Sequence, residues 1–147
     1  MRVLIQRVSK ANVLVKKKII SEIGNGLLVF VAFCDEDNLL DIKWSIKKII
    51  NLRIFSDHMK KMNYSLSDKN GDILIVSQFT LFASVKKGNR PSLNGAASSK
   101  KGKKLYDCFI DTLNKSYMPK KVFTGLFGAD MEVKLKNEGP VTIFFDS

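Results

Sequence analysis

The stretch ILIVSQFTLF, residues 73–82, is the longest strand candidate in the sequence. Its first four residues are aliphatic, so both faces are apolar, which is typical of a strand buried within a sheet. Ser77, Gln78 and Thr80 then interrupt the apolar run. Burying such polar groups without hydrogen-bond partners costs about 1–3 kcal/mol each. Alternate members of SQFTL therefore either point to solvent or have polar partners inside the protein.

Shorter strand candidates lie on both sides of this stretch and show apolar alternation with β-branched or aromatic residues. They cover residues 3–8, 12–15, 19–23, 27–33, 52–55, 122–124, 131–135 and 141–145. The sequence Gly24-Asn25-Gly26 predicts a turn after which the chain returns as the next strand. The run at 27–33 is apolar throughout, so we expect it to be a central strand.

Two segments show the spacing of amphipathic helices. The acidic stretch 35–38 supplies N-cap candidates for the first helix. Its expected core-facing residues are Leu39, Ile42, Ile46, Ile49 and Ile50. The second helix is expected from about Lys101 to Tyr117, with Leu105, Phe109 and Leu113 buried. Residues 56–70 and 88–99 are polar and turn-rich, which predicts loops.

Strands dominate and helices interrupt them, so the sequence predicts an α+β fold: a β-barrel-like curved sheet with two main helices packed on it. We expect one domain, residues 1–147, large enough to bury a core without metals or disulfides. No apolar run approaches the roughly 20 residues that cross a bilayer, so no membrane partner is expected. Cys34 and Cys108 match no metal or redox spacing, which predicts a cytoplasmic protein.

Basic side chains give the chain a formal net charge of +11. Between residues 86 and 104 basic residues are frequent and no acidic residue occurs. Such a run, with nothing to neutralise it locally, favours contact with nucleic acid. The candidate contacts are Lys86, Lys87, Arg90, Lys100 and Lys101. The run contains no aromatic residue, which argues against a surface that stacks bases.

Familiar catalytic side-chain sets are absent from the sequence. The single histidine, His58, has no cysteine or histidine partner at a ligand spacing, so no metal site is expected. No glycine-rich phosphate loop follows a strand, so no cofactor is expected either. An enzyme with this sequence needs a labile substrate or one that supplies part of the catalytic machinery.

The last segment is NEGPVTIFFDS, residues 137–147. Pro140 cannot donate a backbone hydrogen bond, yet it directly precedes an apolar strand candidate. Turn chemistry favours a Gly139–Pro140 turn that starts this strand. The alternative is a functional element, because a glycine lets the backbone approach a ligand closely. Asn137 and Thr142 can hydrogen-bond locally and hold such an element in place.

SQFTL at 77–81 and the N-x-G-P-x-T pattern at 137–142 resemble the two signatures of the D-aminoacyl-tRNA deacylase family. MRVLIQRVSKANV, LLVFVAF, NLRIF, KMN, KKGNRPS and FGADM follow the order of that family, so the resemblance covers essentially the whole chain. It implies a homodimer with a β-barrel-like α+β fold and an active site at the subunit interface. The implied reaction is hydrolysis of the ester between a D-amino acid and the terminal ribose of tRNA. Removal of glycine mischarged on alanine tRNA is implied as well.

The resemblance also implies how an L-amino acid is rejected. A cis Gly139–Pro140 unit of one subunit reaches into a pocket of the other and excludes the L side chain with its backbone carbonyls. The implied pocket and catalytic residues are Ser77, Gln78, Phe79 and Thr80. The further implied lining residues are Phe127, Ala129 and Met131. Arg7 either fixes this pocket or is a solvated strand residue.

For the hydrolysis, the same resemblance points to backbone N–H groups of Phe79 and Thr80 as oxyanion stabilisers. No base accompanies Thr80, which argues against its acting as a nucleophile. Assistance by the substrate's own 2′-hydroxyl fits this pattern, and Gln78 is expected to order the loop or the terminal adenosine.

Two rival functions stay open at the level of sequence. One is a non-catalytic RNA-binding β-barrel module, which the basic charge and the many strands favour. The other is a more general aminoacyl-ester hydrolase with the same fold, which would differ in accepting both hands of the amino acid.

Overall fold

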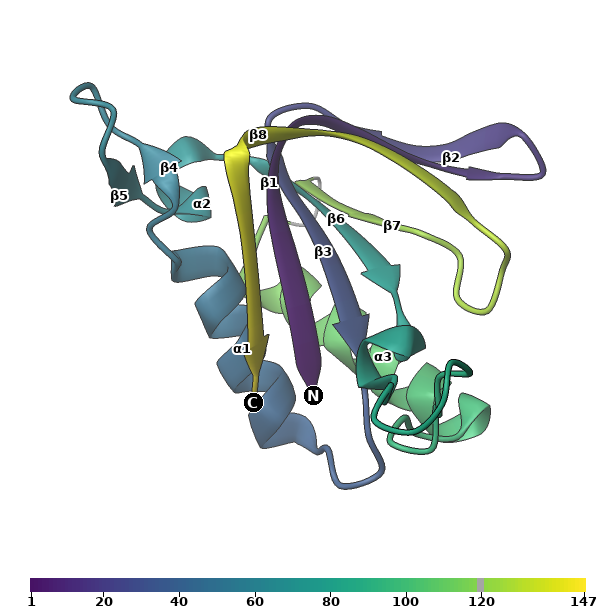
Figure 1. Cartoon of the computed structure of the whole chain (residues 1–147). Helices are drawn as coiled ribbons and strands as arrows, with labels where there is room; N and C mark the ends of the chain where they lie inside the picture. The colour runs from purple at the N-terminus through teal and green to yellow at the C-terminus, as the bar shows by residue number, and fades with distance from the viewer. Residues whose placement is uncertain (119–120) are drawn as a thin grey trace.

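Strand β1 (Arg2–Val15) organises the sheet because it pairs with three other strands. The structure is a computed structural model that describes residues 1–118 and 121–147 (Figure 1). Antiparallel partners of β1 are β3 (Gly26–Ala32) along its first half, β2 (Lys18–Ile23) along its second half, and β8 (Glu132–Asp146) along nearly its whole length. The two separate strands predicted at 3–8 and 12–15 are therefore wrong as separate elements. Residues 9–11 stay extended, with irregular register to β8, and join them into one strand.

The sheet has six strands and mixed direction. The hydrogen-bonded order is β2-β1-β3-β6-β7. Strand β8 is not part of this order and pairs with β1. Strand β6 (Asp72–Ser77) lies parallel to both β3 and β7 (Val122–Thr124). The strands curl into a nearly closed, barrel-like surface (Figure 1), which confirms the predicted α+β class. The chain turns at Gly24 as predicted, but β2 and β3 do not pair, because each pairs with a different half of β1.

Two long helices, α1 (Leu39–Asn51) and α3 (Ser99–Ser116), pack on one face of the sheet. Asn38 caps α1 and forms a capping box with Asp41, so the predicted N-cap stretch is confirmed. The predicted stripe is buried except at Leu39, the first residue of the helix, which is 45% exposed. Helix α3 buries Phe109 and Leu113 as predicted.

The core occupies both faces of the sheet. Alternate residues of the central strands enter a large cluster with the two helices, for example Val29 and Ile75. The residues between them, such as Leu28 and Leu74, enter a second cluster on the opposite face with Val13. Burial on both faces explains why residues 73–76 and the strand at 27–33 are continuously apolar.

The polar stretch 56–70, predicted to be a loop, contains regular structure. Strands β4 (Phe55–Ser56) and β5 (Met62–Tyr64) form a hairpin that extends away from the sheet (Figure 1). The short helix α2 (Leu66–Lys69) follows and begins with a Ser65–Asp68 capping box. The strand predicted at 52–55 is therefore wrong in its extent, because pairing starts only at Phe55.

Strand β8 is continuous, whereas the sequence predicts two strands with a turn between them. The pairs Val8–Asn137 and Gln6–Thr142 are both kept, so residues 138–141 bulge out of the ladder opposite Arg7. A bulge lets a strand accommodate a proline without losing a ladder hydrogen bond. Gly139–Pro140 therefore lies inside β8, and the predicted strand-starting turn is wrong. Figure 1 shows that β8 bends sharply along its length.

Candidate active site

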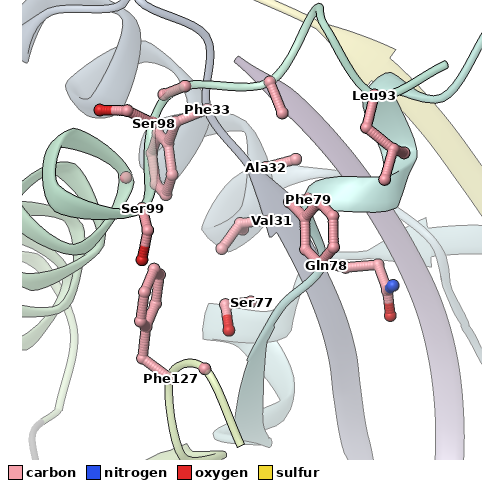
Figure 2. Close-up of a pocket in the computed structure, with 14 residues that line it drawn as sticks. Val31, Ala32, Phe33, Ser77, Gln78, Phe79, Leu93, Ser98, Ser99 and Phe127 are labelled. Atoms are coloured by element: carbon pink, nitrogen blue, oxygen red, sulfur yellow. The ribbon is translucent and has the colours of Figure 1, made fainter.

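A cavity of about 350 Å³ lies at the carboxyl ends of the parallel strands β3 and β6. The loop before α3, the first turn of α3 and the segment 127–128 close it. Its side chains come from Val31, Ala32, Phe33, Ser77, Gln78, Phe79, Leu93, Ala96, Ala97, Ser98, Ser99 and Phe127, with backbone from Gly102 and Gly128. Figure 2 shows Phe33 and Phe127 on one side, Phe79 on the other and Ser77 between them. The walls are thus largely aromatic and aliphatic, with a few hydroxyl groups and one amide, a composition typical of small-ligand pockets.

The SQFTL segment changes direction at this cavity. Ser77 pairs with Val31 as the last residue of β6, and the Gln78 N–H donates to the Val31 carbonyl at 2.8 Å. The chain then enters a 3₁₀ turn, η1 (Phe79–Phe82). The strand predicted over 73–82 is therefore wrong beyond Ser77. Its polar groups lie where the strand ends, so their full burial cost does not arise.

The 3₁₀ turn leaves two backbone donors free. Phe79 and Thr80 occupy its first positions, where N–H groups have no acceptor within the helix. Neither amide has a hydrogen-bond acceptor among residues 1–118 and 121–147. The Thr80 side chain is exposed, and its hydroxyl accepts a hydrogen bond from the Gln78 amide. The Gln78 side chain thus helps to fix the conformation of this turn.

The aromatic wall at Phe127 is supported from behind by α3. The Tyr106 and Phe127 ring centroids are 5.5 Å apart. The Tyr106 hydroxyl donates to the Ile75 carbonyl at 3.3 Å, and burial raises the pKa of this tyrosine well above its usual value. Tyr106 therefore stays a neutral hydrogen-bond donor and fixes the ring against which Phe127 leans.

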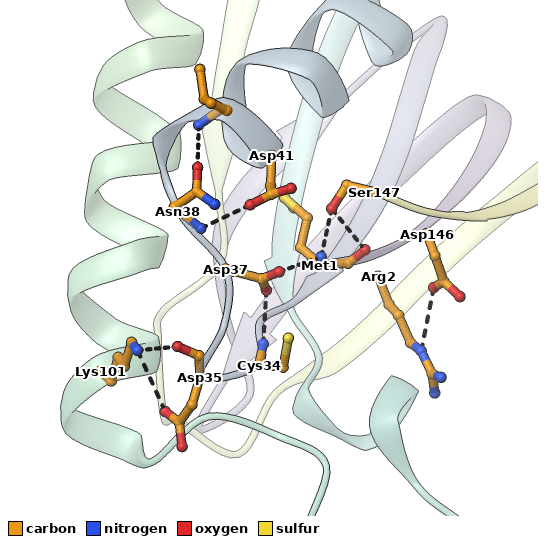
Figure 3. Close-up of polar contacts among 11 residues, drawn as sticks. Met1, Arg2, Cys34, Asp35, Asp37, Asn38, Asp41, Lys101, Asp146 and Ser147 are labelled. Carbon is orange, nitrogen blue, oxygen red and sulfur yellow. Dashed lines mark hydrogen bonds and ion pairs between the residues drawn. The ribbon is translucent and has the colours of Figure 1, made fainter.

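The loop between η1 and α3, residues 83–98, covers one side of the cavity and is called the roof loop. It is bonded to both the sheet and α3. The Ala97 N–H donates to the Phe33 carbonyl at 2.8 Å. Ser98 is the N-cap of α3, and its hydroxyl accepts from the Lys101 N–H. The Lys101 ammonium in turn contacts Asp35, in the segment before α1 (Figure 3). These contacts hold the first turn of α3 beside the end of β3.

Arg2 positions the 3₁₀ turn, a role that the sequence did not indicate. Its guanidinium donates to the Leu81 carbonyl at 2.9 Å and lies 4.5 Å from the centre of the Phe82 ring. It also forms an ion pair with Asp146 at 3.3 Å (Figure 3). This role of Arg2 could not be predicted, because its contact residues lie far from it in the sequence.

The FGADM segment contributes unequally to the cavity. Phe127 and Gly128 line it, whereas Ala129 and Met131 are not among its lining residues. The Met131 sulfur accepts a hydrogen bond from the Leu126 N–H at 3.4 Å, and its side chain packs against the second core cluster. In this chain Met131 therefore shapes the loop that presents Phe127.

The residues of the second signature form a separate cluster on β8. The Gly139–Pro140 peptide bond is cis, and Gly139 has a φ of 117°. The Asn137 amide donates to the Thr142 hydroxyl at 2.9 Å, so these two side chains span the bulge. Gly139 and Pro140 are exposed and do not line the cavity of their own chain.

Arg7 lies directly beneath this bulge and is only 6% exposed, so it is not a solvated strand residue. Its guanidinium donates to the Ile54 carbonyl at 2.5 Å and lies 3.9 Å from the Glu138 carboxylate. A Cβ on Gly139 would lie 2.9 Å from the Arg7 Nη2. Arg7 thus supports the bulge and connects it to the chain that enters β4.

The basic run divides into an exposed loop and the start of α3. Lys86, Lys87 and Arg90 are exposed in the loop, and Lys100 is exposed in the first turn of α3. Lys101 lies near Asp35, and Lys103 pairs with Asp107 at 2.6 Å. The run is therefore partly neutralised by Asp35, which is distant in the sequence, and by Asp107, one turn further along α3. The expectation that nothing neutralises the run locally is corrected at Lys103.

In the part of the chain that the structure describes, no three or more histidine, cysteine or carboxylate side chains cluster to hold a metal. His58 is exposed on the β4–β5 hairpin. No described helix is both long enough and apolar enough to cross a membrane.

Sequence comparison finds one protein family across almost the whole chain. The family described as D-Tyr-tRNA(Tyr) deacylase matches residues 4–146. The D-aminoacyl-tRNA deacylase of Flavobacterium psychrophilum is 52% identical over 147 residues, covering 100% of this chain and 97% of the relative. The D-aminoacyl-tRNA deacylase of Thermosipho melanesiensis is 51% identical with the same coverage.

Structure comparison finds the same fold in solved proteins. A structure described as c-Myc DNA Unwinding Element Binding Protein has a TM-score of 0.95 and 40% identity, and the match covers 100% of this chain and 99% of that chain. A second, described as a probable eukaryotic D-amino acid tRNA deacylase, has a TM-score of 0.85 and covers 99% of this chain and 98% of that chain. At 22% identity the second match supports the fold alone.

Proposed function

Since the chain belongs to the D-Tyr-tRNA(Tyr) deacylase family, we propose that it hydrolyses the ester bond between a D-amino acid and the terminal ribose of tRNA. It is an enzyme, as its relatives named D-aminoacyl-tRNA deacylase are. The non-catalytic RNA-binding alternative is set aside on this ground. The observation that carries the proposal is the family match over residues 4–146, which includes both signatures intact.

We place the ester in the cavity at the ends of β3 and β6. The free N–H groups of Phe79 and Thr80 are suited to stabilise the oxyanion that forms when the ester carbonyl is attacked. Ser77 and Gln78 lie at the same edge of the cavity. Among residues 1–118 and 121–147, no histidine or carboxylate side chain lines this cavity, so none of them supplies a side-chain base there. The substrate's own 2′-hydroxyl assists the attack, which suits an ester because it needs less activation than an amide.

In the proposed dimer, Gly139 and Pro140 of one subunit enter the cavity of the other. There these two residues form the selector, which distinguishes D- from L-amino acids. Their exposure and their absence from the cavity of their own chain support this arrangement. Backbone carbonyls placed there exclude the side chain of an L-amino acid by direct contact, whereas a D side chain points elsewhere. Asn137 and Thr142 hold the bulge. Phe127 lines the opposite wall, and Ala129 and Met131 shape the loop that presents it.

Glycine has no side chain for such a selector to exclude. A backbone selector that rejects only the L side chain therefore admits a glycyl ester as well as a D-aminoacyl ester. Removal of glycine mischarged on alanine tRNA follows from the same geometry. This activity would take place in the cytoplasm, where charged tRNA is used.

The tRNA itself is proposed to contact Lys86, Lys87, Arg90, Lys100 and Lys101, which lie in the roof loop and at the start of α3. Basic side chains at the mouth of a cavity attract a phosphate backbone and speed the encounter. Because Lys101 also contacts Asp35, its contribution to RNA binding is expected to be the smallest of the five.

The direct test compares hydrolysis of D-Tyr-tRNA and L-Tyr-tRNA by the purified protein, with Gly-tRNA(Ala) as a third substrate. We expect release of D-tyrosine and glycine and no release of L-tyrosine above the uncatalysed rate. Equal hydrolysis of both hands would instead support the more general aminoacyl-ester hydrolase, and hydrolysis of neither would refute the proposed function.

A further inference from the structure

The tip of the β4–β5 hairpin is built around one carboxylate. The Asp57 carboxylate accepts hydrogen bonds from the backbone N–H groups of Met59 at 2.8 Å and Lys61 at 3.0 Å, and from the Asn63 amide at 3.3 Å. The Asp57 N–H also donates to the Lys61 carbonyl at 2.8 Å. Lys60 has a positive φ of 61° at the turn. These bonds fix the backbone of residues 57–63 although the segment is polar and exposed.

This arrangement leaves positive charge on the outside of the tip. The side chains of His58, Lys60 and Lys61 are exposed, as are those of Met59 and Met62. Asp57 is the only acidic residue in the hairpin, and it is directed onto the backbone. Among the residues that the structure describes, neither lysine ammonium has an ion-pair or hydrogen-bond partner.

Two further cations lie near the base of the hairpin. Arg53 donates to the Asn63 carbonyl at 2.8 Å, and the Lys69 ammonium lies 4.7 Å from the centre of the Tyr64 ring. Lys69 therefore covers one face of Tyr64, the only aromatic ring of β5. Such a surface suits a phosphate backbone, which attracts basic groups without reference to base identity.

The hairpin starts next to the proposed selector. Arg7 donates to the Ile54 carbonyl, and β4 begins at the following residue. The same guanidinium lies beneath the bulge that contains Gly139. Figure 1 shows the bend of β8 beside β4, with the hairpin extending beyond it. The base of the hairpin and the bulge at Gly139 therefore lie close together, because both contact Arg7.

We propose that the hairpin tip, through Lys60 and Lys61, binds the sugar–phosphate backbone of the tRNA acceptor stem while the terminal ribose occupies the cavity of the other subunit. The placement of the ribose rests on the proposed function. Each tRNA then contacts both subunits: the roof loop of one at its end, and the hairpin of the other along its stem. The hairpin supplies affinity for tRNA and takes no part in the reaction.

The test uses the double variant Lys60→Ala/Lys61→Ala and the matched control Lys16→Ala/Lys17→Ala. The control removes the same charge from the β1–β2 turn, at the opposite end of the sheet (Figure 1). The dissociation constant for uncharged tRNA is measured as a function of salt. Kinetics are measured with D-Tyr-tRNA and with the D-tyrosyl ester of the trinucleotide CCA, which has no acceptor stem.

For the hairpin variant we expect the dissociation constant and the KM for tRNA to rise about three- to tenfold. The slope of log affinity against log salt concentration should fall by about 1.8, as for two lost phosphate contacts on a duplex. The kcat, and the rate with the trinucleotide ester, should change less than about twofold, since only the acceptor stem meets the hairpin. Equal tRNA affinity in both variants would overturn the proposal, as would an equal loss with tRNA and trinucleotide. Failure of the wild-type protein to hydrolyse either ester refutes the proposed function, while the binding measurement still decides the role of the hairpin.

Discussion

In the proposed selector, the surroundings of Gly139 leave little room for a side chain. Its φ of 117° is unfavourable for any residue with a Cβ, and that Cβ would lie 2.9 Å from both Arg7 Nη2 and Val141 Cγ2. Gly139→Ala is therefore expected to lower the free energy of unfolding by about 1–3 kcal/mol. If the bulge is the selector, its displacement should also reduce the ratio of D-Tyr-tRNA to L-Tyr-tRNA hydrolysis at least about tenfold.

Gly88→Ala provides a control for backbone strain. Gly88 also has a positive φ, 64°, but no atom lies within 4 Å of the position that its Cβ would take. This variant should lose stability without a change in the ratio between the two hands. An unchanged ratio in Gly139→Ala, measured with folded protein, would show that Gly139 is structural only.

Thr80 separates a backbone mechanism from a side-chain mechanism. Its hydroxyl is held by Gln78 and has no base as a partner among the described residues, whereas its N–H is free. Thr80→Ala should therefore lower the single-turnover rate with D-Tyr-tRNA less than about tenfold, far short of the loss of 10⁴ or more that removal of a nucleophile causes. A loss of that larger size with unchanged tRNA binding would make the hydroxyl a chemical participant.

The 3₁₀ turn η1 is the element that sets the position of the free N–H groups, and Arg2 ties it to β1 and β8. Arg2→Met removes the hydrogen bond to Leu81 and the contact with the Phe82 ring. We expect a loss of about 1–2 kcal/mol in stability and a fall in kcat/KM of about tenfold, because the oxyanion donors lose their alignment.

Asp146→Asn is the matched control for this element. It breaks only the partly exposed ion pair to Arg2, which contributes less than about 1 kcal/mol. Full activity in Asp146→Asn with reduced activity in Arg2→Met would assign the effect to the turn. Equal activity in both variants would show that the turn holds its position without Arg2.

The free energy of unfolding is expected to depend on pH through Tyr106, a buried residue of helix α3. Burial raises the pKa of Tyr106 above that of an unfolded tyrosine, which is about 10. The protonated form is thus favoured in the folded state, and the associated stability is complete below about pH 10 and is lost as the pH rises above it. Urea unfolding between pH 8 and pH 11 should show a smaller decline for Tyr106→Phe than for the wild type. An equal decline in both proteins would contradict the assignment to Tyr106.

Elements with a strong local pattern could be predicted from the sequence. The helical stripe containing Ile42 and Ile49 is buried as its spacing indicated, and the apolar run at 27–33 is a central strand. Elements whose limits depend on distant partners could not be predicted. The end of β6 at Ser77 depends on its register with Val31, because the polar residues of SQFTL are equally compatible with a strand that continues with alternate side chains in solvent.

The bulge in β8 shows the same limit at the site. A proline in a strand candidate predicts that the strand is broken there. The pairing of β8 with β1 on both sides of Pro140 shows instead a bulge over Arg7, and this pairing cannot be read from the local sequence. The cavity also depends on topology, because Phe33, Phe127 and the roof loop come from distant parts of the chain. SQFTL and the N-x-G-P-x-T pattern predict the site residues within their own segments, but the sequence did not indicate that Phe33 and Leu93 line the cavity or that Arg2 holds the turn.

At the scale of the whole molecule, the two signatures occupy separate regions of one chain. One forms the edge of the cavity, and the other is an exposed bulge on β8 that does not line that cavity. A homodimer with twofold symmetry can bring each bulge to the cavity of the other subunit, and it creates two equivalent sites. We therefore propose that each active site needs residues from two subunits.

Mixing two inactive variants tests this claim most directly. Ala96→Trp fills the cavity of its own subunit, and Gly139→Trp places a bulky side chain on the bulge. If the site is shared, a mixed dimer contains one intact cavity facing one intact bulge. Mixing equal amounts under subunit exchange should then restore about a quarter of wild-type D-Tyr-tRNA hydrolysis, since half of the dimers are mixed and each has one working site. No recovery of activity, with mixed dimers demonstrated by native mass spectrometry, would contradict the shared active site.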